Sequence, residues 1–360
     1  MTEATQSDNP NDIDSLSTLK IQAVSGNLSP SIYANGRNQL PIEITAKAVN
    51  KDGNPLKFSN NTWISILNLC FAESDKKLNR NGNSGWCFTE VENQYSKEIQ
   101  LGSHRSKRFL SGEDGAAIII LYVYTDDIQT KRITVSVDTP NGKHFTTADI
   151  PSGTEKMSVT VAAIQQIIYR KDMLTITPIH ELEKGVNKVI YSDGDTREFD
   201  CHYDNYYITI PLPIINTFTY GYGGGLDEHG KMHPKWICAY HNPSNHQHMI
   251  VAHPGDSKKR TETFGFEGRA TFLGSDSGAI FDLTKKVTFN EHDNAACFTQ
   301  ITFHTGANAW RLNNGQNLSN FAPYWFDTWF EIFDIYGNYG KFNVQFTDDK
   351  LYIKITDRYK

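Results

Sequence analysis

The sequence predicts an all-β protein, with a β-sandwich in its first half and a second, larger β-rich domain of the sandwich type after it. Apolar and polar residues alternate in many short runs, as expected for strands that bury one face. Turn signals rich in glycine, asparagine and aspartate separate the runs, among them ANGRN, KDGNP and TPNG. The first half contains no long stretch with helical periodicity.

Changes in composition divide the chain into four segments. Residues 1–17 are polar, lack an apolar period and are predicted to form a flexible tail. Residues 18–163 carry the first sandwich, and residues 164–172 (IQQIIYRKD) are predicted to be a connector. Residues 173–360 form the β-rich domain, which contains a loop rich in histidine, tyrosine and glycine.

The first domain is predicted to hold eight short strands. They are expected at residues 19–25, 40–49, 62–69, 98–101, 116–124, 132–138, 144–150 and 157–164. Eight strands over about 145 residues, without helical segments between them, are typical of a β-sandwich.

The second domain shows the same strand patterns. They are expected within residues 173–179, 187–195, 206–225, 269–275, 279–283, 286–292, 297–304, 330–346 and 351–359. The segment 323–333 (PYWFDTWFEIF) is the one plausible helix, because Trp325 and Trp329 lie four residues apart, although a strand fits nearly as well.

Two stretches of the first domain resemble bacterial immunoglobulin-like domains of the invasin and intimin type. The stretch 34–58 contains the turn Asp52-Gly53-Asn54-Pro55, and the stretch 121–143 has a T-K-x-I-x-V run before a turn. The resemblance covers roughly residues 19–150 and implies an immunoglobulin-like sandwich and a role in adhesion. The insert 71–93 departs from the family pattern.

Charge and hydropathy exclude some classes of protein. With 35 basic and 41 acidic side chains the chain lacks the basic character of a nucleic-acid-binding protein. The longest apolar run, at residues 116–123, is too short for a membrane-spanning helix. The polar N-terminus is not a cleavable signal peptide, so we expect the protein to be cytoplasmic or released by a signal-independent route.

The five cysteines are widely spaced, and no CxxC motif occurs. The sequence therefore indicates neither a zinc ribbon nor a disulfide framework. Pairing of Cys70 with Cys87 in an oxidising compartment stays open.

The stretch 218–256 is the densest cluster of side chains that could bind a metal. It holds six of the twelve histidines, and we name His241, His246, His248 and His253 as candidate ligands of a divalent metal. No compact metalloenzyme motif accompanies them, so a polar surface loop without a cofactor is the favoured interpretation.

Aromatic residues flank the same histidines. Tyr220, Tyr222, Trp236 and Tyr240 are candidate ligand-binding residues, because large rings next to polar side chains are common in binding surfaces. The alternative that these rings fill a sandwich core has about equal weight.

No complete catalytic motif occurs. In GSDSG (274–278) Asp276 stands where a nucleophile elbow needs serine, which favours a turn. We therefore predict a non-enzymatic bacterial recognition protein, secreted and adhesin-like, lectin-like or toxin-associated, that binds a cell-surface glycan or protein receptor. The alternatives are a metal-dependent enzyme using the His241–His253 cluster and a pore-forming or structural assembly protein; a homo-oligomer is compatible with each.

Overall fold

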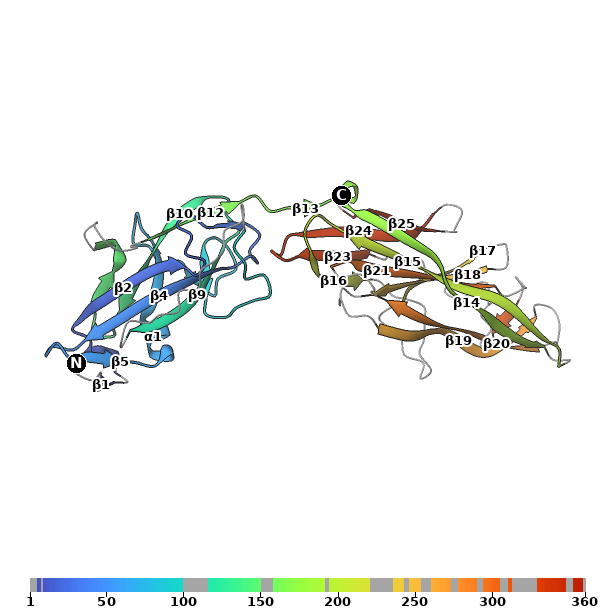
Figure 1. The fold of residues 1–360 in the computed structure, drawn as a ribbon, viewed down its shortest axis with the longest axis horizontal. Coiled ribbons are helices and arrows are strands. Elements are labelled where there is room, and N and C mark those ends of the chain that lie inside the picture. The colour runs from blue at the N-terminus through green and yellow to red at the C-terminus, as the bar shows by residue number, and fades with distance from the viewer. Residues whose placement is uncertain are drawn as a thin grey trace. The chain divides into compact units, whose positions relative to one another are not determined.

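The computed structural model describes residues 5–7, 9–99, 116–149, 158–191, 194–220, 236–242, 246–253, 260–272, 278–289, 294–304, 310–312, 329–347 and 352–358. The predicted all-β fold is confirmed, because strands in several sheets make up most of this part of the chain. The chain divides into two compact units (Figure 1). Unit 1 comprises Met1–Ile167 and Tyr336–Asn338, and unit 2 comprises Ile168–Ile335 and Tyr339–Lys360.

Unit 1 contains two sheets, and Figure 1 shows β2, β4 and β9 of one sheet side by side. The first sheet runs in the order β1 (Thr5–Gln6), β5 (Pro55–Lys57), β4 (Leu40–Val49), β9 (Ala117–Tyr124), β8 (Cys87–Thr89) and β7 (Asn79–Arg80), with β2 (Ser15–Ala23) paired to β4. The second runs in the order β11 (His144–Thr146), β10 (Thr130–Asp138), β12 (Val159–Ile164) and β3 (Ser31–Tyr33), with β6 (Leu67–Phe71) paired to β10.

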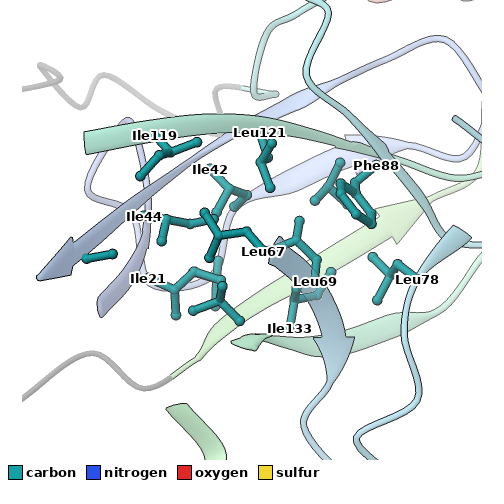
Figure 2. Packing of buried hydrophobic residues seen from close by; sticks show 14 of the residues in the cluster. Ile21, Ile42, Ile44, Leu67, Leu69, Leu78, Phe88, Ile119, Leu121 and Ile133 are labelled. Carbon is teal, nitrogen blue, oxygen red and sulfur yellow. The ribbon is translucent and has the colours of Figure 1, made fainter. Parts of the chain in front are cut away.

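Aliphatic side chains from both sheets form the core of unit 1. Ile42 and Ile44 of β4 are fully buried, and so are Leu69 of β6 and Ile133 of β10. Figure 2 shows these side chains directed into one common core. The buried positions of β4 alternate with less buried ones, so the alternation in the sequence marks the inward face of the strand.

A helix replaces the first part of the strand predicted at residues 62–69. This helix, α1 (Asn60–Ile66), begins after Ser59, whose hydroxyl accepts a hydrogen bond from the Thr62 backbone N–H at 3.1 Å. Trp63 and Ile66, three residues apart, are both buried. The prediction of a strand is therefore wrong for residues 62–66, because the serine cap and helical spacing override the short apolar run.

The flexible tail predicted for residues 1–17 is too long. Ile13 is fully buried in the core, and β2 already begins at Ser15. Asp14 also forms an ion pair with Lys143 at 2.8 Å. Burial of Ile13, with Leu16 packed against the same core, holds this segment against the sheet.

Unit 2 also contains two sheets. One runs in the order β13 (Ile168–Tyr169), β24 (Tyr339–Phe346), β23 (Trp329–Asp334) and β16 (Ile214–Tyr220), with β25 (Ile353–Asp357) paired to β24. The other runs in the order β17 (Trp236–Asn242), β18 (His246–His253), β21 (Ala296–His304), β15 (Thr196–Thr209), β14 (Thr175–Tyr191), β20 (Gly278–Phe289), β19 (Arg260–Phe272) and β22 (Trp310–Leu312).

Phenylalanine rings packed at tilted angles join the two sheets of unit 2. The ring centroid of Phe330 in β23 lies 4.6 Å from that of Phe298 in β21 and 5.2 Å from that of Phe342 in β24. Residues 329–333 belong to β23, so the helix considered for 323–333 is wrong there and the strand alternative is confirmed; residues 323–328 lie outside the described residues. No helix in the described part of the chain is long and apolar enough to cross a membrane.

Candidate functional site

Most of the predicted site residues lie at positions for which the structure describes only the backbone. Tyr220 ends β16, Trp236 and Tyr240 lie in β17 with His241, and His246, His248 and His253 lie in β18; Tyr222 is outside the described residues. These binding residues therefore stay a prediction.

The backbone of this region nevertheless corrects one expectation. Residues 236–242 and 246–253, predicted to be part of a surface loop, form paired strands, with Tyr240 opposite His248. β18 pairs in turn with β21, where His246 lies opposite His304. Each strand contains a short continuous apolar run, at residues 236–240 and 249–252, and such runs rich in aromatic and β-branched residues are typical of strands.

The described residues do not contain a metal site. In the described part of the chain no group of three or more histidine, cysteine or acidic side chains could hold a metal ion. The side chains of His241, His246, His248 and His253 are not among those described, so their role as ligands also stays a prediction.

A polar cavity lies within unit 1. Its volume is about 430 Å³, and neutral hydrogen-bonding side chains dominate its lining: Gln39, Asn81, Asn83, Thr89, Asn93 and Tyr124. The rest of the lining is Gly36, Gly82 and Val91, so no charged residue contributes to this described wall. The chemistry suits a neutral ligand with hydroxyl or amide groups.

One wall of the cavity is held by a pair of amide side chains. Gln39 donates a hydrogen bond to the Val91 carbonyl at 3.2 Å and accepts one from the Asn93 backbone N–H at 2.8 Å. The Asn93 side-chain amide donates to the Arg37 carbonyl at 2.8 Å. Because Gln39 is only 4% exposed, these bonds form a rigid support below the cavity.

Another part of the lining belongs to the loop 81–86, which connects β7 to β8. The Tyr124 hydroxyl donates to the Gly82 carbonyl at 2.8 Å, and the Gly85 N–H donates to the Asp126 carboxylate at 2.6 Å. The Cys87 thiol donates to the Ser84 carbonyl at 3.2 Å. The loop is thus pinned at three points along its length.

Steric room limits the residue at one position of this loop, and the backbone conformation limits it at another. A Cβ atom at Gly82 would lie 2.7 Å from Asn79 Cβ and 2.8 Å from Cys87 Sγ, so only glycine fits there. Asn81 has a φ of 52°, a left-handed conformation that asparagine tolerates better than most residues.

The loop presents hydrogen-bonding groups to solvent. Asn81 and Asn83 are exposed, and their side chains make no hydrogen bond within the described part of the chain. Each amide offers both donors and an acceptor. Val91, 66% exposed, adds an apolar contact surface beside them.

Two ionisable groups beside the cavity, Tyr124 and Cys87, have raised pKa values. Burial, with a smaller contribution from Cys87, raises the pKa of Tyr124. Burial likewise raises the pKa of the Cys87 thiol, against the hydrogen bond to Ser84. The site therefore offers hydrogen bonds and apolar contact rather than a nucleophile or a charge.

The pairing of Cys70 with Cys87 is not formed. Both are free, buried thiols, and Cys70 Sγ lies 3.4 Å from Ser136 Oγ. Burial raises the pKa of Cys70 to about 11, although the Ser136 hydrogen bond works in the opposite direction.

A second polar cluster lies in unit 2, on β14 and β15. His180 Nδ1 lies 3.4 Å from the buried carboxylate of Asp204, and the ring of His180 meets Tyr206 and Tyr352 edge-on. The Tyr206 hydroxyl donates to Gln300 Oε1 at 3.3 Å. This arrangement orients an imidazole beside a buried carboxylate, but no nucleophilic side chain is found beside it in the described residues.

Comparisons with known proteins give little further guidance. No protein-family model matches the chain, and no curated protein matches it either. One solved structure with similarity is that of invasin, described as a bacterial integrin-binding protein, at 9% identity and a TM-score of 0.19, covering 95% of this chain and 79% of that chain. A TM-score this low does not indicate a shared fold, so the invasin-type resemblance of residues 19–150 stays a prediction.

The cavity residues were missed by sequence reasoning. The segment NRNGNSG (79–85) shows only turn chemistry, and Gln39 meets Asn93 across 54 positions of the chain. The one available signal was that the insert 71–93 departs from the pattern of the family that the flanking strands resemble.

Proposed function

We propose that the chain is a non-enzymatic recognition protein, lectin-like or adhesin-like, and that the cavity of unit 1 binds a cell-surface glycan. The observation that carries the proposal is the pinned loop 81–86, which presents two unengaged amides above a rigid amide-supported wall. Binding residues are often carried by loops that a rigid scaffold positions. A site organised before the ligand arrives loses less entropy on binding.

The neutral lining favours a saccharide over a charged ligand. Side-chain amides can donate to and accept from the same sugar hydroxyls, and Val91 offers an apolar surface for a sugar C–H face. A protein receptor is the alternative partner. The backbone amides of such a receptor would contact the same loop.

A glycan array incubated with the labelled full-length chain tests the proposal. We expect binding to neutral glycans, and we expect it to be lost in a double variant, Asn81→Gly with Asn83→Ala. Glycine at position 81 preserves the left-handed backbone there. Asn61→Ala is the matched control, because Asn61 is an exposed amide on α1, away from the cavity.

Binding to cells separates the two partner classes. Loss of binding after glycosidase treatment supports a glycan, and loss only after protease treatment supports a protein receptor. Absence of binding to both the array and the cells would contradict the proposal.

The other predicted functions keep separate tests. A metal-dependent enzyme requires bound metal at His241, His246, His248 or His253, which elemental analysis of the purified protein would detect. A pore-forming protein would release dye from liposomes. Tyr220, Tyr222, Trp236 and Tyr240 are proposed as a further contact surface in unit 2, and their substitution by alanine would test this.

A further inference from the structure

One histidine of unit 1 lies between two carboxylates. His144 and Asp138 are opposite each other in the β10–β11 pair, and His144 Nδ1 lies 2.6 Å from Asp138 Oδ1. On the other edge of the ring, His144 Nε2 lies 3.1 Å from Asp75 Oδ2. Asp75 belongs to the turn 71–76 that follows β6, so the imidazole joins two separate segments of the unit.

The two contacts require both ring nitrogens to carry a proton. A neutral imidazole has one N–H donor, and its other nitrogen presents a lone pair. Facing a carboxylate oxygen, that lone pair would be repelled. Only the imidazolium form donates to Asp75 and Asp138 together.

The surrounding charges point to the same protonation state. Lys77 Nζ lies 2.8 Å from Asp138 Oδ2, and the Asn68 amide donates to the same oxygen. Lys77 thus offsets the charge of Asp138, and a protonated His144 balances the negative charge of Asp75.

Neighbouring charged groups are engaged elsewhere. Arg132 pairs with Glu73 at 3.3 Å beside the turn, and Lys143, adjacent to His144 in sequence, pairs with Asp14 at 2.8 Å. Neither cation therefore replaces the imidazolium between Asp75 and Asp138.

We infer that His144 is a proton-operated clasp that holds the turn 71–76 against the β10–β11 hairpin when its imidazole is charged. The inference is independent of the proposed glycan site. The clasp adds to backbone bonds that already hold the turn, including Ala72 N–H to the Arg132 carbonyl at 2.9 Å, so its release loosens the turn without unfolding the unit.

The pH dependence of the clasp follows from the titration of its imidazole and of its carboxylates. Two carboxylates stabilise the imidazolium in the folded state, so the clasp is complete below the ordinary histidine pKa of about 6.5 and is lost as pH rises through the folded value. Burial works to raise the pKa of Asp138, but hydrogen bonds from His144 and Lys77 outweigh it and lower that pKa. The contribution of Asp138 is therefore present above its ordinary pKa and is lost as pH falls through the lowered folded value.

Side-chain ¹H–¹⁵N correlation spectra of the full-length chain, recorded from about pH 5 to about pH 9, test the clasp. The His144 signal is assigned from its absence in His144→Gln. We expect its pKa to lie above the ordinary value and to fall in Asp75→Asn by on the order of 0.5–1 pH unit, a three- to tenfold loss of proton affinity. Asp52→Asn, which removes an exposed charge from the turn between β4 and β5, is expected to leave the pKa of His144 unchanged.

Hydrogen-exchange protection at the Asp75 amide provides a second readout. That N–H donates to the Phe71 carbonyl at 2.9 Å. We expect its protection factor to fall severalfold between about pH 6 and about pH 8.5 in the unmodified chain and to stay constant in His144→Gln. An ordinary His144 pKa that Asp75→Asn does not move, or equal pH dependence of protection in both chains, would overturn the inference.

Discussion

Unit 1 and unit 2 are both built from β-sheets, but different side chains fill their cores. The core cluster of unit 1 consists mainly of isoleucine, leucine, valine and alanine. The described core of unit 2 contains the Phe298, Phe330 and Phe342 rings together with fully or nearly buried polar groups such as Asn205 and Asp334.

The two cores are stabilised by different interactions. An aliphatic core is stabilised by burial and close packing, which tolerate small changes of shape. A core with buried amides and carboxylates also needs each of those groups to keep its hydrogen bonds. Unit 1 also buries polar side chains, among them Asn38 and Gln39, but unit 2 fully buries the Asp334 carboxylate. Unit 2 is therefore expected to be more sensitive than unit 1 to the loss of a hydrogen bond to a buried carboxylate.

Truncation of a central ring is expected to have the largest effect. Phe330→Ala removes a ring that contacts both Phe298 and Phe342, and we expect the free energy of unfolding to fall by about 3–5 kcal/mol. Ile44→Val in the core of unit 1 is expected to cost about 0.5–1.5 kcal/mol. Urea denaturation measures both, and a loss in Phe330→Ala no larger than that in Ile44→Val would contradict the central position of the Phe330 ring in the core of unit 2.

Removal of a single buried hydroxyl sharpens the same contrast. The Tyr169 hydroxyl donates to Asp334 Oδ2 at 2.7 Å, and both residues are fully buried. Tyr169→Phe is expected to cost about 1.5–3 kcal/mol, because the bond is made to a carboxylate. Thr134→Val, which removes a neutral bond to the Cys70 carbonyl in unit 1, is expected to cost about 0.5–1.5 kcal/mol. A larger loss in Thr134→Val would reverse the expected order.

The loop of the cavity is one place where unit 1 does not tolerate added volume. In Gly82→Ala the new methyl group would overlap Asn79 and Cys87, and we expect a loss of about 1–3 kcal/mol with displacement of the loop. Gly53→Ala is the control, because Gly53 has a φ of 78° but no neighbour within 4 Å. It is expected to cost about 1–2 kcal/mol from backbone strain alone and to leave ligand binding intact. Equal binding by both variants would argue against the cavity as the site.

The thiol of Cys70 is expected to be almost unreactive in the folded chain. Its pKa, raised to about 11 by burial, keeps it protonated at a pH of about 9, where an ordinary cysteine is mostly thiolate. Because the pKa of Cys70 is higher in the folded than in the unfolded chain, the protonated thiol favours the folded state. This contribution to the free energy of unfolding is fully present below the ordinary thiol pKa and is lost as pH rises through the folded pKa. Peptide mapping after iodoacetamide treatment should show at least tenfold slower alkylation in the native state than in urea. Equal rates would show that the thiol is accessible.

Much of the architecture could be predicted from local patterns. The run LPIEITAKAV became β4 and RITVSVD lies within β10, because apolar residues alternate with other residues in both runs, which is typical of strands. The helix α1 was missed because the side-chain cap of Ser59 decides between helix and strand where the apolar pattern fits both.

The candidate site was harder to predict for a physical reason. Its lining comes from segments that are separated in sequence and meet through hydrogen bonds such as those between Gln39 and Asn93. Turn residues such as Asn81 and Asn83 reveal where the chain bends, but not what the bend faces. In the segment 218–256 the strands β17 and β18 were hidden by the high histidine content, although their apolar residues follow a strand pattern.

The most direct test of recognition through unit 1 is the dissociation constant for the best neutral glycan from the array, measured by calorimetry. We expect the Asn81→Gly, Asn83→Ala double variant to bind about tenfold or more weakly than the unmodified chain, since two hydrogen bonds of about 0.5–1.5 kcal/mol each are lost. Asn61→Ala should bind like the unmodified chain. Unchanged affinity in the double variant would contradict the assignment of the cavity as the binding site.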